Sequence, residues 1–349
     1  MLKIRLYQHW EHRNETTFRP YLSAASLFRD IGIQFVFDGP HDLTWIGQAT
    51  YANKAIPMET MLKVNHSWTM KDVTGDYIFF DGQDSPSVTG AWEAFCEWDA
   101  KILLKNSLYV DKSWYDVPTV HGRYWWGNAE SHDQPSHYNY VPKGLDLSKI
   151  KLSGTNWLST VNPFWYRLED VPKDIDVFAM FSCPSKPNFE YNLLINQFYD
   201  AHRTPCIETI KQLPPQVSVA RLINGKKVPV EQYYQNMLRS KIIVAPFGYG
   251  EIAPRDLESA MVHAVLIKPD MNHVETIPNP YVANETYRPC KWDFSDLNDI
   301  IIDTLDNYEY YRDKFVTNLR ETYLKLYKPE FVVEYMHGII SSIDGYGTI

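Results

Sequence analysis

The sequence predicts an α/β protein made of two domains, each built on a parallel sheet with helices on both faces. Three observations lead to this class. The chain has 349 residues, more than one hydrophobic core usually organises. Short apolar runs alternate with helical patterns in two separate stretches of the chain, and an aromatic-rich, irregular segment lies between those stretches. Strand–helix alternation favours parallel strands joined by crossover helices.

The first stretch of alternation covers about the first hundred residues. Glycine, proline and aspartate turns separate its apolar runs, as in Asp38-Gly39-Pro40 and Asp81-Gly82. We expect strands at residues 3–7, 33–37, 43–46, 76–80 and 101–104, and helices at residues 21–30 and 90–100.

Residues 111–172 break this rhythm. They are rich in Trp, Tyr, His, Asn and Pro and show neither the helical nor the strand period. We interpret them as an irregular excursion followed by a connection between domains, although such a loop could also form one wall of a binding site.

The alternation restarts at Asp176 and continues to the end of the chain. The apolar periodicity predicts strands at residues 176–181, 216–222, 241–245 and 265–267. It predicts helices at residues 189–213, 230–239, 254–263, 296–326 and 329–340.

These elements divide the chain into two Rossmann-like domains that we expect to face each other across a cleft. The N-terminal domain covers residues 1–150, with the irregular excursion at about 111–150. Residues 151–172 connect it to a C-terminal domain over residues 173–328, and the final segment, 329–349, could pack back on the N-terminal domain. In sheets of this kind ligands bind at the carboxyl ends of the strands.

Composition excludes several classes of protein. A net charge of −9 without any basic run disfavours binding to nucleic acid, whose phosphates require Lys and Arg. The four cysteines are scattered without a C-x-x-C pair, which is typical of reduced thiols. The sequence shows no signal peptide and no apolar stretch of transmembrane length, so we expect a cytoplasmic protein without a transmembrane segment.

Residues 240–281 contain the densest functional pattern. An apolar strand ends in the turn Pro246–Gly250, and Pro254 then stands where the first turn of a helix tolerates proline. The amides at such a helix start, together with the helix dipole, favour an anion such as a diphosphate. Gly248 and Gly250 allow a close approach of the backbone, and we place Tyr249 in the same site.

Arg255 and Glu258 lie three residues apart near the start of this helix, away from its apolar face. A guanidinium can bind phosphate oxygens through two parallel donors, and a carboxylate can accept both hydroxyls of a ribose. An ordinary surface Arg–Glu pair is an equally good interpretation of the spacing by itself.

This stretch resembles the donor site of exostosin-like glycosyltransferases and their relatives in the GT-B superfamily, some of which are encoded by viruses. The resemblance rests on a series of matching elements over about residues 233–281: Ser240, Lys241, Pro246, Gly248, Arg255, Glu258 and Val265-Leu266-Ile267. It implies a GT-B fold and a nucleotide-sugar donor, most simply a UDP-sugar. It also implies that Arg255 contacts phosphate and Glu258 contacts ribose.

The same resemblance bears on the stereochemistry of transfer. Retaining relatives often carry two glutamates with seven residues between them, the first of which lies near the donor sugar. Glu251 and Glu258 have six residues between them. The resemblance to exostosins implies an inverting enzyme, and the spacing argues against the alternative, a retaining one. Glu251 stays a candidate donor-site residue.

Three further residues are candidates for donor binding. Ser182 and Lys186 follow the first strand of the second domain, and Arg221 ends the next strand. Each could meet the nucleotide, although a solvated loop lysine and a strand-end arginine are ordinary surface features.

Transfer to a hydroxyl needs a general base in the first domain. Asp84 and Asp81 follow a buried strand, where we expect them at the rim of the cleft, and His9 follows the opening strand in the same way. We favour the two aspartates, at least one of which could be a plain turn residue. A metal pair at these aspartates is disfavoured because GT-B enzymes typically stabilise the leaving diphosphate with backbone dipoles and cations.

The sequence thus predicts a glycosyltransferase that moves a sugar from a nucleotide diphosphate sugar to a glycan hydroxyl without a required metal or other cofactor. A catalytically silent nucleotide or glycan binder is the alternative from another class. A dehydrogenase is disfavoured because no G-x-G-x-x-G follows an early strand.

Overall fold

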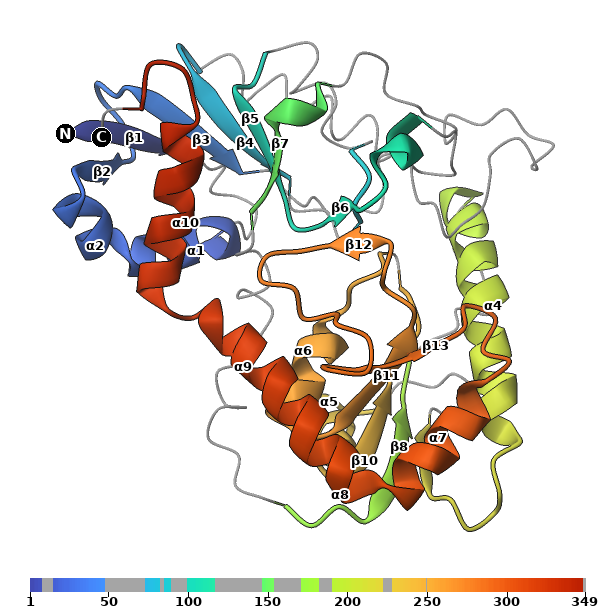
Figure 1. The fold of residues 1–349 in the computed structure, drawn as a ribbon. Coiled ribbons are helices and arrows are strands. Elements are labelled where there is room, and N and C mark those ends of the chain that lie inside the picture. The colour runs from blue at the N-terminus through green and yellow to red at the C-terminus, as the bar shows by residue number, and fades with distance from the viewer. Residues whose placement is uncertain are drawn as a thin grey trace. The chain divides into compact units, whose positions relative to one another are not determined.

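The computed structural model describes ten stretches of the chain: residues 1–7, 15–47, 73–81, 85–88, 99–116, 146–153, 171–181, 190–221, 228–248 and 250–347. The chain divides into two compact units. Unit 1 comprises Met1–Thr160, Val274–Pro278 and Leu324–Ile349, and unit 2 comprises Val161–His273 and Asn279–Tyr323. Each unit is described by itself below, with the element labels of Figure 1.

Unit 1 is built on a parallel sheet of six strands in the order β2-β1-β3-β4-β5-β7. The central strands are buried on both faces, as the near-continuous apolar run Tyr77–Phe80 requires of a covered parallel sheet. The strands are β1 (Leu2–Tyr7), β2 (Ile33–Val36), β3 (Leu43–Gly47), β4 (Tyr77–Asp81), β5 (Ile102–Lys105) and β7 (Ile150–Leu152).

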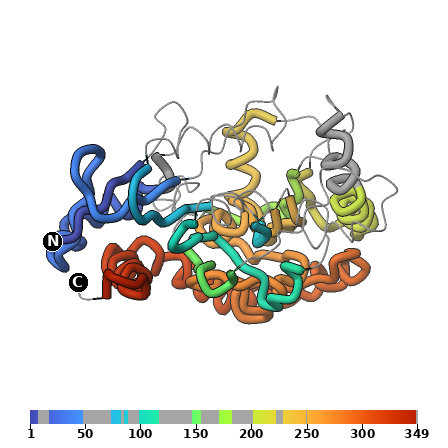
Figure 2. The backbone as a smooth tube through the Cα atoms, turned by 90° about the horizontal axis from the view of Figure 1, so that it is seen from above, coloured from blue at the N-terminus to red at the C-terminus, as the bar shows by residue number. Residues whose placement is uncertain are grey.

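Three helices cover one face of this sheet: α1 (Glu15–Ser23), α2 (Ala25–Asp30) and α10 (Pro329–Ser341). The last helix brings Val332, Met336 and Ile340 into one core with the strand residues Trp45 and Phe80. Figure 2 shows α10 in red beside the blue N-terminal elements. The two ends of the chain are therefore parts of the same hydrophobic core.

The other face of the sheet packs on a second apolar cluster that includes Phe79, Leu103 and Tyr109. Here β6 (Leu108–Tyr109) pairs antiparallel with β12 (Val274–Glu275), a segment that the later part of the chain contributes to unit 1. Lys112, in the 3₁₀ helix Lys112–Asp116, joins Glu275 at 2.5 Å. A second 3₁₀ helix, Leu147–Lys149, leads into β7.

Unit 2 is built on a parallel sheet of five strands in the order β13-β11-β10-β8-β9. Strand β9 lies on one side of β8, and β10, β11 and β13 follow on its other side. The strand order therefore reverses between β8 and β10, which is the place where open α/β sheets bind ligands. The strands are β8 (Ile175–Ala179), β9 (Val219–Arg221), β10 (Ser240–Val244), β11 (Val265–Pro269) and β13 (Arg288–Cys290).

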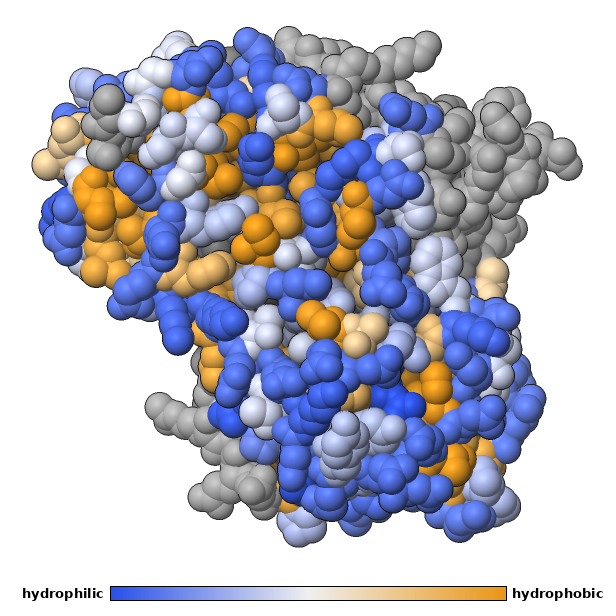
Figure 3. Space-filling model, viewed as in Figure 1, coloured by the Kyte–Doolittle hydropathy of each residue, from blue (hydrophilic) through white to orange (hydrophobic). Residues whose placement is uncertain are grey.

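Helices α4 and α7 pack together on this sheet, where Cys206, Ile210 and Ile301 share one core with the strand residues Val177 and Ile242. Figure 3 shows mostly hydrophilic residues over α8 and α9, whose buried faces carry Tyr308 and Leu319. The helices are α4 (Glu190–Lys211), α5 (Val230–Leu238), α6 (Pro254–Met261), α7 (Leu297–Asp306), α8 (Tyr308–Tyr311) and α9 (Thr317–Lys325), with a π-helical turn at Arg312–Val316.

The prediction of an α/β protein with parallel sheets is confirmed. The predicted helix at residues 21–30 is instead two helices that meet at Ala24, and the predicted helix at residues 90–100 lies largely outside the described residues. Strand β7 lies within the stretch predicted to be irregular, and β6, β12 and β13 were not predicted. In the part of the chain that the structure describes, no helix has the length and apolar character to cross a membrane.

The packing of α10 gives a test of the unit 1 core. Met336 is fully buried, so Met336→Ala should lower the free energy of unfolding by about 2–5 kcal/mol through lost burial and a cavity. Glu334→Ala, on the exposed side of the same helix, should change it by less than about 0.5 kcal/mol. Urea unfolding followed by circular dichroism measures both, and equal effects would contradict this packing.

Candidate functional site

The candidate site begins at the end of β10, next to the point where the strand order of unit 2 reverses. The strand leads through Ala245 and Phe247 into the glycine turn, and the chain then enters α6 at Pro254. Gly248 donates its N–H to the carbonyl of Gly250 at 2.9 Å, which closes the turn on itself. Tyr249 lies outside the described residues.

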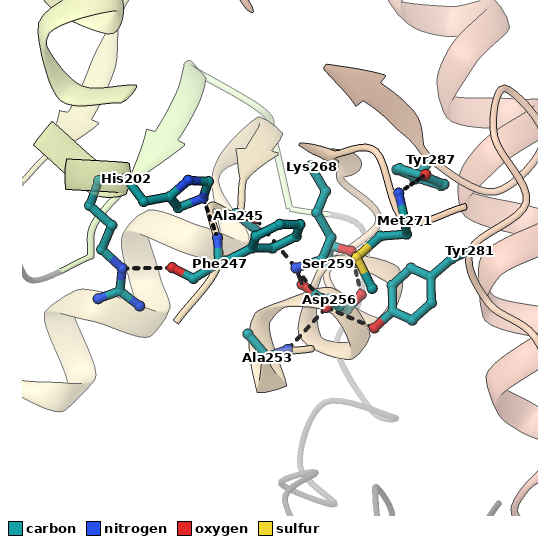
Figure 4. A network of polar contacts seen from close by, with 11 residues as sticks. His202, Ala245, Phe247, Ala253, Asp256, Ser259, Lys268, Met271, Tyr281 and Tyr287 are labelled. Atoms are coloured by element: carbon teal, nitrogen blue, oxygen red, sulfur yellow. Dashed lines mark hydrogen bonds and ion pairs between the residues drawn. The ribbon is translucent and has the colours of Figure 1, made fainter. Parts of the chain in front are cut away.

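Two consecutive residues of α4 hold this turn by the backbone of Phe247 (Figure 4). The Phe247 N–H donates to His202 Nε2 at 3.1 Å, and Arg203 Nε donates to the Phe247 carbonyl at 2.9 Å. The rings of His202 and Phe247 are also stacked, with their centroids 5.0 Å apart. Burial, together with the charges of Arg203 and Lys268, lowers the pKa of His202 to about 3, so the imidazole is neutral and accepts this hydrogen bond.

The start of α6 differs from the expected row of open amides. Its N-cap residue, Ala253, has no side-chain acceptor, and the Ala253 N–H donates to Asp256 Oδ2 at 3.0 Å. Pro254 has no N–H at all. Binding of an anion here therefore depends on the Arg255 side chain more than on the helix amides.

Arg255 combines one fixed contact with one open donor. Its Nε donates to Tyr233 Oη at 3.2 Å, and its guanidinium carbon lies 5.8 Å from the centroid of the Phe181 ring, just after β8. Its buried Nη1 has no hydrogen-bond partner among the described residues. A buried cationic donor in this state favours an anionic ligand that would satisfy it.

Glu258 lies one turn further along α6 and is 7% exposed. Burial raises the pKa of Glu258 to about 7, a rise that the Arg255 charge opposes and the Asp256 charge favours. Arg255 is itself only partly exposed, so the two residues do not form the exposed surface pair that the spacing alone allowed. A perturbed carboxyl beside an arginine is typical of functional sites.

Glu251 lies in the turn before α6, and its side chain is 0% exposed. Neither of its carboxylate oxygens has a hydrogen-bond partner among the described residues. His273 Nε2, from the loop after β11, lies 3.8 Å from Glu251 Oε1. Burying a carboxylate this way is costly, so the position suits a polar ligand group rather than fold stability.

A buried ion pair lies beneath this site. Lys268 Nζ, from β11, lies 3.2 Å from Asp256 Oδ2, and both side chains are 0% exposed. Tyr281 donates its hydroxyl to the same carboxylate oxygen at 2.8 Å. Figure 4 shows these groups converging on the first turn of α6.

The remaining predicted donor residues have different positions. Arg221 ends the edge strand β9 and is exposed, and among the described residues it forms no hydrogen bond or ion pair with α6. Ser182 and Lys186 lie outside the described residues.

In unit 1, Asp81 lies at the carboxyl end of its strand, where the sequence analysis expected it, but its side chain is buried. It is the last residue of β4, is 0% exposed, and joins Lys105 Nζ at 2.5 Å. A buried pair of this kind favours a structural role for Asp81. Asp84 and His9 lie outside the described residues.

Sequence analysis missed several of the residues that shape the site: His202, Arg203, Asp256, Lys268 and Tyr281. One signal was present. Lys268 interrupts an otherwise apolar strand, and a lysine there needs a buried acid. The contacts of α4 had no comparable signal because 45 residues separate His202 from Phe247.

Within the described ranges, no group of three or more His, Cys, Asp or Glu side chains is placed to hold a metal ion.

The arrangement defines a class: an α/β protein with a guanidinium and two carboxyl groups gathered at the carboxyl edge of a parallel sheet. No protein-family model matches the chain, and no curated protein matches it in sequence. Comparison with solved structures does find similarities over nearly the whole chain.

Three of these structures are as follows. The HepE protein of Anabaena in complex with UDP-glucose has a TM-score of 0.49 and 10% identity, over 98% of this chain and 100% of that one. Sucrose-phosphate synthase of Thermosynechococcus elongatus has a TM-score of 0.46 and 11% identity, over 97% and 98%. The BGT of T4 phage in complex with its UDP-glucose substrate has a TM-score of 0.45 and 10% identity, over 98% and 100%.

The raised pKa of Glu258 gives a test in the absence of any ligand. The folded state holds this proton more tightly than the unfolded state, so folding stability should fall as the pH rises from 4.5 to about 7. The pKa change corresponds to about 3 kcal/mol. Glu258→Gln should therefore be more stable than the parent at about pH 8, by up to this amount, and show little difference near pH 4.

Glu231→Gln, on the exposed side of α5, is the matched control and should give no such pH-dependent difference. Thermal unfolding across this pH range makes the measurement. The same stability difference for Glu258→Gln at both ends of the range would contradict a raised pKa.

Proposed function

We propose that this chain is a glycosyltransferase of the GT-B type, with the site at the start of α6 as its nucleotide-sugar site. The observation that carries the proposal is that a cationic donor and a carboxyl group lie one helical turn apart. Arg255 has a buried donor without a partner, and Glu258 is a buried carboxyl of raised pKa one turn away. Both follow β10, beside the reversal of strand order where α/β sheets bind nucleotides.

Each group has a role in this proposal. Arg255 binds oxygens of the diphosphate, since a guanidinium meets phosphate through charge-assisted hydrogen bonds. Glu258 accepts the ribose hydroxyls in its ionised form. Glu251, whose oxygens are buried without hydrogen-bond partners among the described residues, accepts hydroxyls on the sugar side of the donor. The resemblance to exostosin-like transferases supports a UDP-sugar as that donor.

The proposed reaction is inverting. A hydroxyl of the glycan acceptor attacks the anomeric carbon in line, the bond from that carbon to the diphosphate oxygen breaks, and the acceptor proton passes to a general base. Arg255 stabilises the charge that develops on the leaving diphosphate. Because Asp81 is committed to Lys105, Asp84 is the proposed base, with His9 as the other candidate.

Donor binding is tested with Arg255→Ala. The variant should bind UDP more weakly than the parent by about 1–3 kcal/mol, the usual contribution of hydrogen bonds to charged groups. Isothermal titration calorimetry with UDP and with GDP measures the loss and the preference for the base. Arg239→Ala is the matched control, because Arg239 pairs with Asp174 at the opposite edge of the same sheet. Equal affinities for the parent and Arg255→Ala would refute the site.

The donor itself can be identified by thermal shift with a panel of nucleotide sugars. A true donor stabilises the folded protein by about 2.7 kcal/mol at a concentration a hundred times its Kd. We expect UDP-sugars to raise the melting temperature of the parent and to leave that of Arg255→Ala nearly unchanged. A panel in which no nucleotide sugar raises it would contradict the proposal.

The buried Asp81–Lys105 pair favours one rival, a nucleotide binder without turnover, because a carboxylate paired with a lysine is a weak general base. Asp84→Ala separates the two functions. A transferase should lose sugar transfer and keep its affinity for UDP, whereas a silent binder shows donor binding without transfer in the parent as well.

A further inference from the structure

Asp256 lies between the two proposed donor-binding residues in sequence but is more deeply buried than either. Arg255 is partly exposed, whereas Asp256 is 0% exposed and faces the sheet. Its carboxylate contacts three separate parts of unit 2: the start of its own helix at Ala253, strand β11 at Lys268, and the later loop at Tyr281.

The contact with Ala253 replaces a conventional helix cap. Serine, threonine or aspartate usually caps a helix by accepting an N–H of its first turn. Ala253 cannot do so, and Asp256 instead reaches back to the Ala253 N–H at 3.0 Å. The direction in which the chain enters α6, and hence the backbone position of Arg255, is therefore set by Asp256.

The contact with Lys268 makes the burial of this carboxylate possible. Lys268 Nζ lies 3.3 Å from Asp256 Oδ1 and 3.2 Å from Oδ2, so the pair carries no net charge. Lys268 Nζ also lies 3.4 Å from the Ala245 carbonyl and 5.3 Å from the centroid of the Phe247 ring. One ammonium thus links the end of β10, the glycine turn and the first turn of α6.

Tyr281 completes the set of donors on Asp256. Burial and the Asp256 charge raise the pKa of Tyr281 well above its ordinary value, so its hydroxyl keeps the proton that it donates. Ser259 does not compete for the carboxylate, because its hydroxyl donates to the Asp256 carbonyl at 2.7 Å. The carboxylate is thus fixed by three donors: the Ala253 N–H, the Lys268 ammonium and the Tyr281 hydroxyl.

We propose that Asp256, held by Lys268 and Tyr281, is a positioning residue that places the Arg255 guanidinium for binding of the donor diphosphate. This inference rests on the proposed function and deepens it. Asp256 touches no ligand in this account. It acts through Arg255. Its effect on UDP binding should therefore depend on Arg255, whereas a general effect on folding should not.

The experiment is a double-mutant cycle of Asp256→Asn and Arg255→Ala, read as the Kd for UDP by calorimetry. Asp256→Asn keeps the shape of the side chain and removes its charge. In the parent background it should weaken UDP binding about tenfold, the affinity equivalent of one charged hydrogen bond. In the Arg255→Ala background it should weaken binding less than about twofold, because the group through which it acts is gone.

Stability is followed in the same four proteins by thermal unfolding. Loss of the buried charge should lower the melting temperature in both backgrounds alike, which a merely structural residue would also do. Met336→Ala is the control for destabilisation without repositioning, because Met336 is fully buried in α10, within unit 1. It should lower the melting temperature and leave the Kd for UDP unchanged well below that temperature.

The outcomes separate the two proposals. If Arg255→Ala leaves UDP affinity unchanged, the proposed function fails. If Arg255→Ala weakens binding but folded Asp256→Asn does not, or if the two losses simply multiply, the positioning role fails and the donor site stands. Should Asp256→Asn not fold, Tyr281→Phe removes one hydrogen bond from the same carboxylate and should give about a threefold, equally Arg255-dependent loss.

Discussion

The parallel pairing of β10 with β8 is the constraint on which the rest of unit 2 depends. It places the carboxyl end of β10 at the reversal of strand order, and the chain there must turn back to enter α6. The polar groups of the candidate site are gathered at this edge of the sheet. Phe181 leaves β8 beside the guanidinium of Arg255, and the loop after β11 brings His273 towards Glu251.

Two kinds of buried polar group lie at this edge, and they differ in how they are satisfied. Asp256 and Lys268 neutralise each other, and Tyr281 donates a further hydrogen bond to the carboxylate, so these groups are satisfied within the protein. Glu251, Glu258 and the Nη1 of Arg255 are buried with far fewer contacts among the described residues. A fold gains nothing from such groups by themselves, and the proposed function accounts for them as groups that a ligand satisfies.

Much of the architecture could be predicted because buried parallel strands are nearly continuous apolar runs. Residues 77–80 and 241–245 are such runs, and the structure has a strand at each. Strands of two or three residues, such as β6 and β12, carry no such pattern, because their pairing depends on a partner more than 160 residues away. The break between α1 and α2 at Ala24 could not be predicted either, since the apolar period continues through it.

The site was predictable only where one local segment carries it. Residues 248–258 combine a glycine turn, a proline at a helix start and an Arg–Glu spacing, so Arg255 and Glu258 could be chosen as candidates from this segment together with its family resemblance. The burial of Asp256 could not be predicted, because it depends on Lys268 and Tyr281 being near in space. The buried environment of Asp81 likewise depends on Lys105, which belongs to the neighbouring strand.

The central claim is that a nucleotide diphosphate binds at the carboxyl edge of the unit 2 sheet. A crystal structure of the protein with UDP tests this claim most directly. Our account places phosphate oxygens within hydrogen-bond distance of Arg255 and the ribose hydroxyls on Glu258. Clear density for UDP elsewhere, with the Arg255 Nη1 still buried against protein, would contradict it.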